Sequence, residues 1–182
     1  MRKVIYGAAC SLDGFIAGPG GSLDWLHWSA DVERVMAETW ARTDTVIMGR
    51  KTWEVSAAMG NAGAAIPGVS GYVCSRTLTE MPDGAGATLI TSDAGDFVRQ
   101  LKREPGREIC VLGGGILAAS LLAAGVIDEV GLNIHPVLLG SGVPFLHDAG
   151  RIGLDLAECR TLDGGCILAI YRVRGPDRPR IA

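Results

Sequence analysis

The chain has 182 residues, of which 48% are hydrophobic, 20% charged and 5% aromatic, and this balance excludes a disordered or collagen-like protein. A chain of this length can bury one sizeable core without disulfides or a structural metal. The formal net charge is −3, with 17 Lys plus Arg against 20 Asp plus Glu, so nucleic acid is not expected as a partner. No stretch approaches the ~20 apolar residues of a membrane span, and we expect a cytoplasmic protein without a membrane partner.

The cysteines and histidines give no sign of a disulfide framework or a metal site. The five cysteines are odd in number, form no C-x-x-C pair and mostly lie in apolar runs, which predicts reduced core residues. His135 and His147 have no partners at metal-ligand spacing, so no metal is expected. We expect a single domain over residues 1–174, followed by a loose polar tail over residues 175–182.

Strand-like and helix-like patterns alternate along the chain. Apolar runs rich in β-forming residues predict strands over residues 3–10, 45–48, 71–75, 87–91, 108–112 and 129–135. Ser29 is placed to cap a helix whose apolar stripe is Val32, Val35, Met36 and Trp40. Further helices are predicted over residues 52–59, 93–102 and 116–124, the last ended by Gly125.

The end of the chain has a different pattern. Residues 154–162 and 166–173 flank Asp163–Gly164, which predicts a hairpin with a tight turn. The whole pattern therefore predicts an α/β fold with helices on the faces of a mixed, mostly parallel sheet that has an antiparallel end.

The strongest local signal is the run from Glu108 to Ala118, in which an apolar strand passes through Gly113, Gly114 and Gly115 into a helix. Such a junction directs bare backbone N–H groups and a helix N-terminus toward an anion, and glycine allows a diphosphate to approach closely. The run also matches the dinucleotide fingerprint G-x-G-x-x-A, although that fingerprint normally lies on the first strand. The structural alternative is a tight strand-to-helix turn.

Two other strand ends carry chemistry suited to anions. The run Gly49-Arg50-Lys51-Thr52 offers two cations and a hydroxyl where a helix begins, and the alternative is a capped helix with solvated cations. Ser75-Arg76 places a hydroxyl beside a guanidinium, and taken alone it is equally typical of a turn. Three such strand ends in one α/β chain favour a ligand with several phosphates, lying across the C-terminal edge of the strands.

These segments resemble a known family. The runs over residues 11–17, 48–54, 75–76 and 112–115 occur in the order and spacing of the dihydrofolate reductase superfamily. Residues 125–129 and 135–142 are similar to its bacterial branch near the reductase domain of riboflavin-pathway deaminase-reductases. The resemblance covers about residues 3–173. It implies a three-layer dihydrofolate reductase-like fold and an NADPH-dependent reductase that passes hydride to a C=N bond or masked carbonyl of a pterin-like or aminopyrimidine substrate.

The resemblance also implies roles for particular residues. The NADPH-binding residues would be Gly49, Arg50, Lys51, Thr52, Ser75, Arg76, Leu112, Gly113, Gly114, Gly115 and Ile116, with Ser75 and Arg76 near the 2′-phosphate. Asp31 matches by position the acidic residue of dihydrofolate reductases, and a raised pKa would let it deliver a proton. The alternative for Asp31 is a first-turn acid that complements the helix dipole.

Two further residues are candidates for contact with the substrate. Asp13 could orient a substrate ring or form an ordinary Asp-Gly turn, and Trp25 could be an aromatic wall or plain packing.

Two departures separate this chain from riboflavin-pathway enzymes. Leu112 stands where their reductases usually have a glutamate, and the zinc deaminase signature is absent from the sequence. We therefore expect a stand-alone reductase that acts on a small-molecule substrate, with a second copy of the chain in a homodimer as a further expectation. The alternative function is a catalytically inactive NADP(H)-binding sensor or interaction protein of the same fold.

Overall fold

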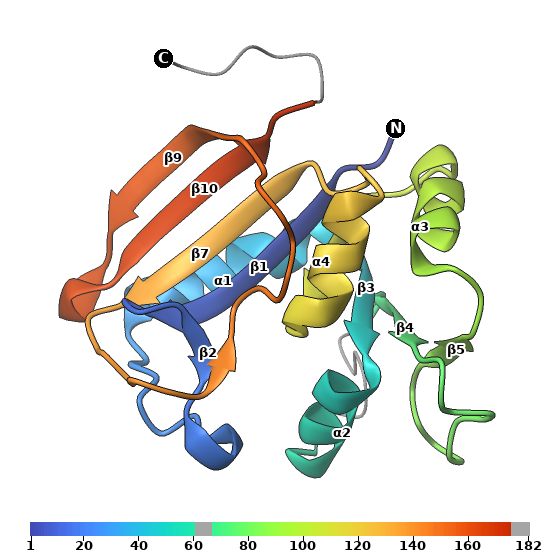
Figure 1. The fold of residues 1–182 in the computed structure, drawn as a ribbon, viewed down its shortest axis with the longest axis horizontal. Coiled ribbons are helices and arrows are strands. Elements are labelled where there is room, and N and C mark those ends of the chain that lie inside the picture. Colours follow the sequence, from blue (N-terminus) through green and yellow to red (C-terminus); the bar gives the residue numbers. More distant parts are fainter. Residues whose placement is uncertain (61–66, 176–182) are drawn as a thin grey trace.

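The structure is a computed structural model that describes residues 1–60 and 67–175, and its centre is a twisted sheet of eight strands (Figure 1). The strand order is β5-β4-β3-β6-β1-β7-β10-β9. All neighbouring pairs from β5 to β7 are parallel, and β10 and β9 continue the sheet antiparallel. The strands are β1 (Val4–Ser11), β3 (Thr43–Gly49), β4 (Ser70–Cys74), β5 (Thr88–Ile90), β6 (Glu108–Leu112), β7 (Glu129–His135), β9 (Leu154–Thr161) and β10 (Ile167–Val173).

Four helices cover the two faces of this sheet. They are α1 (Ala30–Arg42), α2 (Arg50–Ala58), α3 (Ala94–Arg103) and α4 (Gly115–Ala123). Side chains of α1 and α2 pack into clusters on one face, where Val32 meets Leu168 and Trp53 meets Val46. Side chains of α3 and α4 pack with Tyr6 and other residues of β1, β3 and β6 on the opposite face. The predicted α/β fold, with its mostly parallel sheet and antiparallel end, is confirmed.

The helix ends show why these segments are helical. Ser29 Oγ accepts the N–H of Val32 at 3.3 Å, as the sequence predicts, and Asp93 caps α3 through the N–H of Asp96 at 2.9 Å. Gly125, with φ of +67°, follows the end of α4 in the left-handed conformation. The prediction that α2 begins at Thr52 is wrong. Gly49 is the N-cap, so the helix begins at Arg50 and Thr52 lies inside its first turn.

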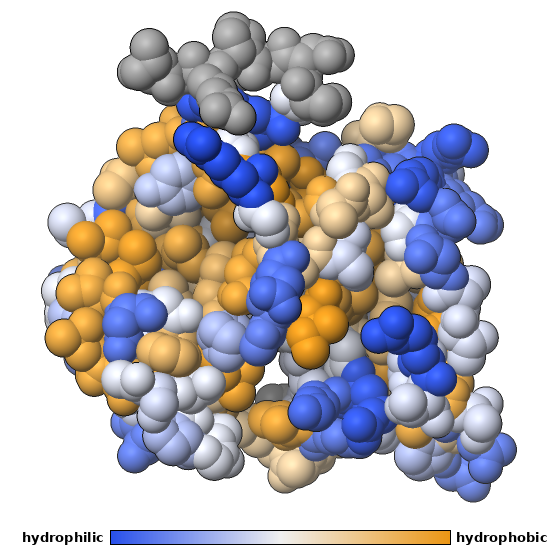
Figure 2. Space-filling view, viewed as in Figure 1, coloured by the Kyte–Doolittle hydropathy of each residue, from blue (hydrophilic) through white to orange (hydrophobic). Residues whose placement is uncertain are grey.

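The predicted hairpin is present as β9 and β10, joined by a short 3₁₀ turn over Asp163–Gly165. It extends beyond the part of the sheet that α3 and α4 cover, and Figure 2 shows hydrophobic side chains spread over that region. Leu156 and Ile167 are among its exposed apolar residues. A second, two-stranded pairing of β2 (Phe15–Ala17) with β8 (Val143–Pro144) was not predicted.

The structure also tests the smaller expectations. All five cysteines are free, but Cys159 is exposed on the edge strand β9, so the prediction that the cysteines are core residues is wrong there. No helix within residues 1–60 and 67–175 has the length and apolar character needed to cross a membrane. In the same ranges no three His, Cys, Asp or Glu side chains gather as a metal site would require. The predicted tail lies, apart from Gly175, outside the described residues.

Candidate cofactor and substrate site

The sheet brings the three predicted anion-binding strand ends to one edge. Met48 pairs with Leu112 across β3 and β6, and Gly49 pairs with Cys74 across β3 and β4. Each of these strands is parallel to its neighbour, so the segments that follow them leave the sheet side by side. The runs starting at Arg50, Ser75 and Gly113 are therefore adjacent, as the sequence predicts.

Two helices begin at this edge with free N-termini. The N-caps of α2 and α4 are Gly49 and Gly114, and neither forms a side-chain capping hydrogen bond. The first N–H groups of a helix have no partner within the helix, and the macrodipole adds partial positive charge there. Two such helix starts beside each other form a site suited to a phosphate or diphosphate.

The glycines of the second helix start lie against Thr52 of the first. Gly113 and Gly114 have φ of +52° and +65°. A Cβ added to Gly113 would lie 2.9 Å from Thr52 Oγ1, and one on Gly114 would lie 3.5 Å from the same atom. The turn at Gly113 and Gly114 therefore brings the start of α4 into contact with the start of α2. Side chains in place of these two glycines would fill the space beside Thr52.

Gly115 has a different role. A Cβ added to Gly115 would lie 2.7 Å from the carbonyl oxygen of Phe145, so this glycine allows α4 to pack against the segment that follows β8. Ile116 is 66% exposed in the first turn of α4.

The cations of the site differ in their partners. Arg50 forms an ion pair with Glu54 at 2.6 Å, one turn further along α2. Lys51 and Arg76 are exposed. Ser75 Oγ accepts the N–H groups of Thr77 and Leu78, so Ser75 forms a local turn that holds Arg76 beside the end of β4.

A second part of the site lies over β1 and β7, on the face that α1 covers. Gly7 pairs with Gly131 and Ala9 pairs with Asn133, while Asn133 also pairs with Leu168, which packs against α1. Gly7, Ala9 and Gly131 are only half-buried although they lie in central strands. A Cβ added to Gly131 would meet nothing within 4 Å. These small residues therefore leave open space beside Gly131, on the face of the sheet that α1 covers.

The same face of β7 ends at His135, a buried residue that the sequence did not indicate as functional. His135, at the end of β7, is 1% exposed and accepts the backbone N–H of His27 on Nδ1 at 3.2 Å. Desolvation, and then the charge of His27, lowers the pKa of His135. Trp25 stands edge-on to the His135 ring, with the ring centroids 5.3 Å apart, so Trp25 packs against His135. The available sequence signal was a pair of polar residues, Asn133 and His135, on one face of an apolar strand.

Asp31 does not have the environment expected of a proton donor. Its carboxylate accepts the N–H of Asp163 at 3.1 Å and a hydrogen bond from Arg34 at 2.5 Å. These hydrogen bonds lower the pKa of Asp31, so the prediction of a raised pKa is wrong. The structure instead shows Asp31 tying the start of α1 to the turn between β9 and β10.

The flanks of α1 explain this placement. Asp31, Arg34 and Glu38 share the flank near β9, where Glu38 pairs with Arg160 at 3.3 Å. Glu33 lies on the other flank with Trp40, two turns later, and Trp40 packs against the cluster that includes Leu112. Glu33 is therefore the first-turn acid of α1 on the side of the open space.

Asp13 holds a loop in place. Its carboxylate accepts the Ser11 hydroxyl at 2.6 Å and the N–H groups of Leu139 and Gly140 at 3.1 and 2.7 Å. The Ser11 bond and those backbone bonds lower the pKa of Asp13. These bonds fit a turn residue better than a residue that contacts a substrate ring. Asp13 also bonds to Leu139 and Gly140, which lie in a loop far along the chain, so it fixes that loop as well as its own turn.

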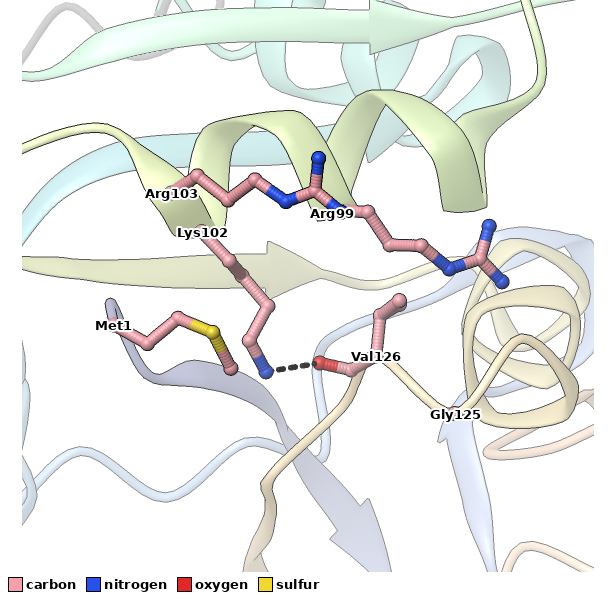
Figure 3. A pocket seen from close by; sticks show the side chains of 6 residues that line it. All are labelled: Met1, Arg99, Lys102, Arg103, Gly125 and Val126. Atoms are coloured by element: carbon pink, nitrogen blue, oxygen red, sulfur yellow. Dashed lines mark hydrogen bonds between the residues drawn. The ribbon is translucent and has the colours of Figure 1, made fainter.

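A separate shallow cavity of about 240 Å³ lies at the opposite edge of the sheet (Figure 3). It is lined by Met1, Arg99, Lys102, Arg103, Gly125 and Val126. Lys102 Nζ donates to the carbonyl of Val126 at 3.0 Å and pairs with Asp128 at 2.6 Å, while Arg99 pairs with Asp96. Because these cations already have partners and the cavity adjoins the C-terminal end of α4, we do not assign the function to it.

Comparisons with known proteins agree with the geometry. Residues 2–168 match the family model of the RibD C-terminal domain. The chain is 31% identical over 192 residues to the uncharacterized protein YyaP of Bacillus subtilis (strain 168), covering 96% of this chain and 97% of that protein. A putative riboflavin biosynthesis protein from Shewanella sp. PV-4 has a similar structure, with a TM-score of 0.84, 26% identity, and coverage of 96% of this chain and 100% of the other.

A dihydrofolate reductase from Enterococcus faecalis, solved with NADP(H) and RAB-propyl, has a TM-score of 0.67 at 16% identity. The match covers 95% of this chain and 97% of that one. At this identity the likeness establishes the shared dihydrofolate reductase-like fold.

Proposed function

The chain belongs to the family of the RibD C-terminal domain, and from this membership we propose that it is an NADPH-dependent reductase that transfers hydride to a C=N bond or masked carbonyl of a pterin-like or aminopyrimidine molecule. The observation that carries the proposal is the meeting of two uncapped helix N-termini, at Gly49 and Gly114, over a glycine turn. This anion site adjoins the open space beside Gly131 over β1 and β7, and we place the substrate there.

The residues present fit NADPH. Gly113 and Gly114 carry no side chain at the start of α4, where the first backbone N–H groups have no partner within the helix. Any larger side chain at these two positions would fill the cradle that they form with Thr52. Arg76 supplies a guanidinium at the next strand end, suited to bidentate contact with a 2′-phosphate. NADPH, when bound, supplies the hydride, and the chain holds the phosphates and orients the ring toward the open space.

Reduction of a C=N bond also requires a proton. Because Asp31 is engaged with Asp163 and Arg34, we place proton delivery, directly or through water, on the flank of α1 that carries Glu33. Glu33 is exposed, so it can exchange protons with solvent between turnovers.

The activity can be tested by following NADPH oxidation by absorbance with a panel of dihydropterins, dihydrofolate and ribosylaminopyrimidines. The proposal predicts turnover with at least one member of the panel. Saturable NADPH binding without turnover on any of them would instead support the non-catalytic alternative, and the absence of both would contradict the proposed function.

Replacing Arg76 with alanine is expected to weaken NADPH binding about 10- to 100-fold, because one charged hydrogen-bonded contact contributes roughly 1.5–3 kcal/mol. NADH affinity is expected to change less than about 3-fold, since NADH lacks the 2′-phosphate that Arg76 would contact. Isothermal titration calorimetry with both dinucleotides measures the difference. Arg103→Ala, at an exposed arginine of the opposite edge, is the matched control. Equal affinity of the parent protein for NADPH and NADH would contradict this assignment.

A further inference from the structure

Tyr6 reaches from the centre of the sheet to the segment that follows β8. It is fully buried in β1, and its ring stacks on the ring of Phe145 with the centroids 4.6 Å apart. The Tyr6 hydroxyl donates a hydrogen bond of 2.5 Å to the carbonyl oxygen of Phe145. The N–H of Phe145 donates to the carbonyl of Gly14 at 2.8 Å. The backbone N–H and carbonyl of Phe145 therefore both have fixed partners.

The same carbonyl lies beside the start of α4. The position of a Cβ added to Gly115 is 2.7 Å from the Phe145 oxygen. Because the Cα–Cβ bonds of a helix tilt toward its N-terminus, the oxygen lies on the side of the first N–H groups. The first hydrogen bond of α4 runs from the N–H of Ala118 to the carbonyl of Gly114 at 3.1 Å. The N–H groups of residues 115–117 therefore have no partner within the helix.

The partner of the Phe145 carbonyl determines whether these N–H groups stay free. A carbonyl that accepted from α4 would cap the helix and remove a donor from the proposed diphosphate site. The Tyr6 hydroxyl takes this place instead, and within residues 1–60 and 67–175 no backbone N–H donates to the Phe145 oxygen. Burial, and then the charge of Cys10, raises the pKa of Tyr6, so its hydroxyl keeps the proton that it donates.

We propose that Tyr6 is a positioning residue for the cofactor: by holding the Phe145 carbonyl, it keeps the first N–H groups of α4 free to bind the diphosphate of the dinucleotide. This inference rests on the proposed function of the paired helix starts. Tyr6 lies in the middle of β1 and acts through a backbone carbonyl. Its hydroxyl is therefore expected to affect cofactor binding as well as folding.

Tyr6→Phe tests the proposal, because it removes the hydroxyl and keeps the stacked ring. A buried acceptor without a donor is unfavourable, so the freed carbonyl is expected to accept from the start of α4. Calorimetry should show an NADPH dissociation constant about 10-fold higher than that of the parent protein. An NADPH affinity within about 3-fold of the parent would overturn the proposal.

Thr43→Val is the matched control for the loss of a buried hydroxyl. Thr43 is 1% exposed, and its hydroxyl donates to the carbonyl of Thr39 at 2.9 Å, at the edge of the sheet opposite the proposed site. This variant should also melt at a lower temperature than the parent, but its NADPH affinity should change less than about 3-fold. An equal loss of affinity in Thr43→Val and Tyr6→Phe would overturn the proposal.

Gly115→Ala perturbs the same contact from the side of the helix. The added methyl group would press on the Phe145 carbonyl, and while Tyr6 holds that carbonyl the start of α4 has to move. We expect about 10-fold weaker NADPH binding in Gly115→Ala, but less than about 3-fold further loss when this change is added to Tyr6→Phe. Losses that multiply in the double variant would overturn the proposal.

Amide exchange of the protein without cofactor gives a test that does not depend on the proposed reductase. Exchange at the N–H groups of residues 115–117 should slow about 5-fold or more in Tyr6→Phe, because the freed carbonyl protects them, and should stay parental in Thr43→Val. Unchanged exchange in Tyr6→Phe would overturn the proposal. Slower exchange in Tyr6→Phe, with no NADPH binding to the parent, would contradict the proposed reductase while retaining the role of Tyr6 at the start of α4.

Discussion

Replacing Gly114 with valine is expected to weaken NADPH binding by about 100-fold or more, because several phosphate hydrogen bonds are lost together. The valine side chain would project into the cradle, where the nearest neighbour of an added Cβ is Thr52 Oγ1 at 3.5 Å. The space lost is that which a diphosphate needs to reach the N–H groups of α2 and α4. Calorimetric titration with NADPH measures the effect.

Gly125→Val separates this effect from backbone strain. Gly125 follows the other end of α4 with φ of +67°, close to the +65° of Gly114, and an added Cβ there meets nothing within 4 Å. Valine in this conformation costs roughly 1–3 kcal/mol at either position, so both variants should melt at similarly lower temperatures. Only Gly114→Val should lose NADPH. A folded Gly114→Val protein with parental affinity would show that the glycine turn does not hold the cofactor.

Replacing Asp44 with alanine is expected to lower the free energy of unfolding by about 2–4 kcal/mol, because it leaves a buried guanidinium without its counter-ion. The Arg2 side chain is 6% exposed and pairs with Asp44. Asp44 also accepts the N–H of Arg107 at 2.6 Å and the Thr45 hydroxyl at 2.9 Å. This cluster ties the starts of β1, β3 and β6 together at the edge opposite the proposed site. Urea denaturation measures the loss.

Glu108→Ala is the matched control at the same edge. Glu108 pairs with Arg42 at 3.2 Å, but the Arg42 side chain is 53% exposed. Loss of this pair should cost less than about 1 kcal/mol. Equal losses in the two variants would contradict the role assigned to the buried pair.

The Asp44 contribution should also depend on pH. Desolvation raises the pKa of Asp44, but hydrogen bonds from Arg107 and Thr45 and the charge of Arg2 outweigh it, and the net pKa is lowered. The contribution is therefore complete above the pKa of the unfolded chain and is lost as the pH falls toward the lower folded value. The difference between parent and Asp44→Ala should thus shrink between about pH 7 and pH 3.

The parts of the site that depend on local chemistry were predictable from the sequence. The strand over residues 108–112, the glycines after it and the run at Arg50 were located because a strand-to-helix junction is encoded by contiguous residues. Their meeting at one edge followed from parallel pairing alone.

The sequence could not predict which acidic residue in the first turn of α1, Asp31 or Glu33, faces the proposed site. Apolar periodicity indicates which face of α1 is buried, but it does not indicate which flank meets the hairpin and which meets the open space. That choice depends on contacts such as Asp31 with the N–H of Asp163, 132 residues away. Without these contacts, the sequence does not show which of Asp31 and Glu33 lies on the flank of α1 that meets the open space.

The environment of His135 depends on distant contacts as well. The tautomer of His135 is set by the N–H of His27, 108 residues earlier in the chain, and no spacing in the sequence signals this bond. Cys159 is exposed for a related reason, because its apolar strand became the edge of the sheet. The extent to which a face is covered is a property of the assembled fold.

Hydrogen–deuterium exchange with and without NADPH tests the central claim most directly, because it reports both whether the cofactor binds and where. The account predicts slower exchange at the backbone N–H groups of residues 50–53 and 113–118, with further protection near Arg76. Residues 99, 102, 103, 125 and 126, which line the cavity at the opposite edge, should exchange as in the free protein. Protection confined to that cavity, or no protection at saturating NADPH, would contradict the assignment of the cofactor to the paired starts of α2 and α4.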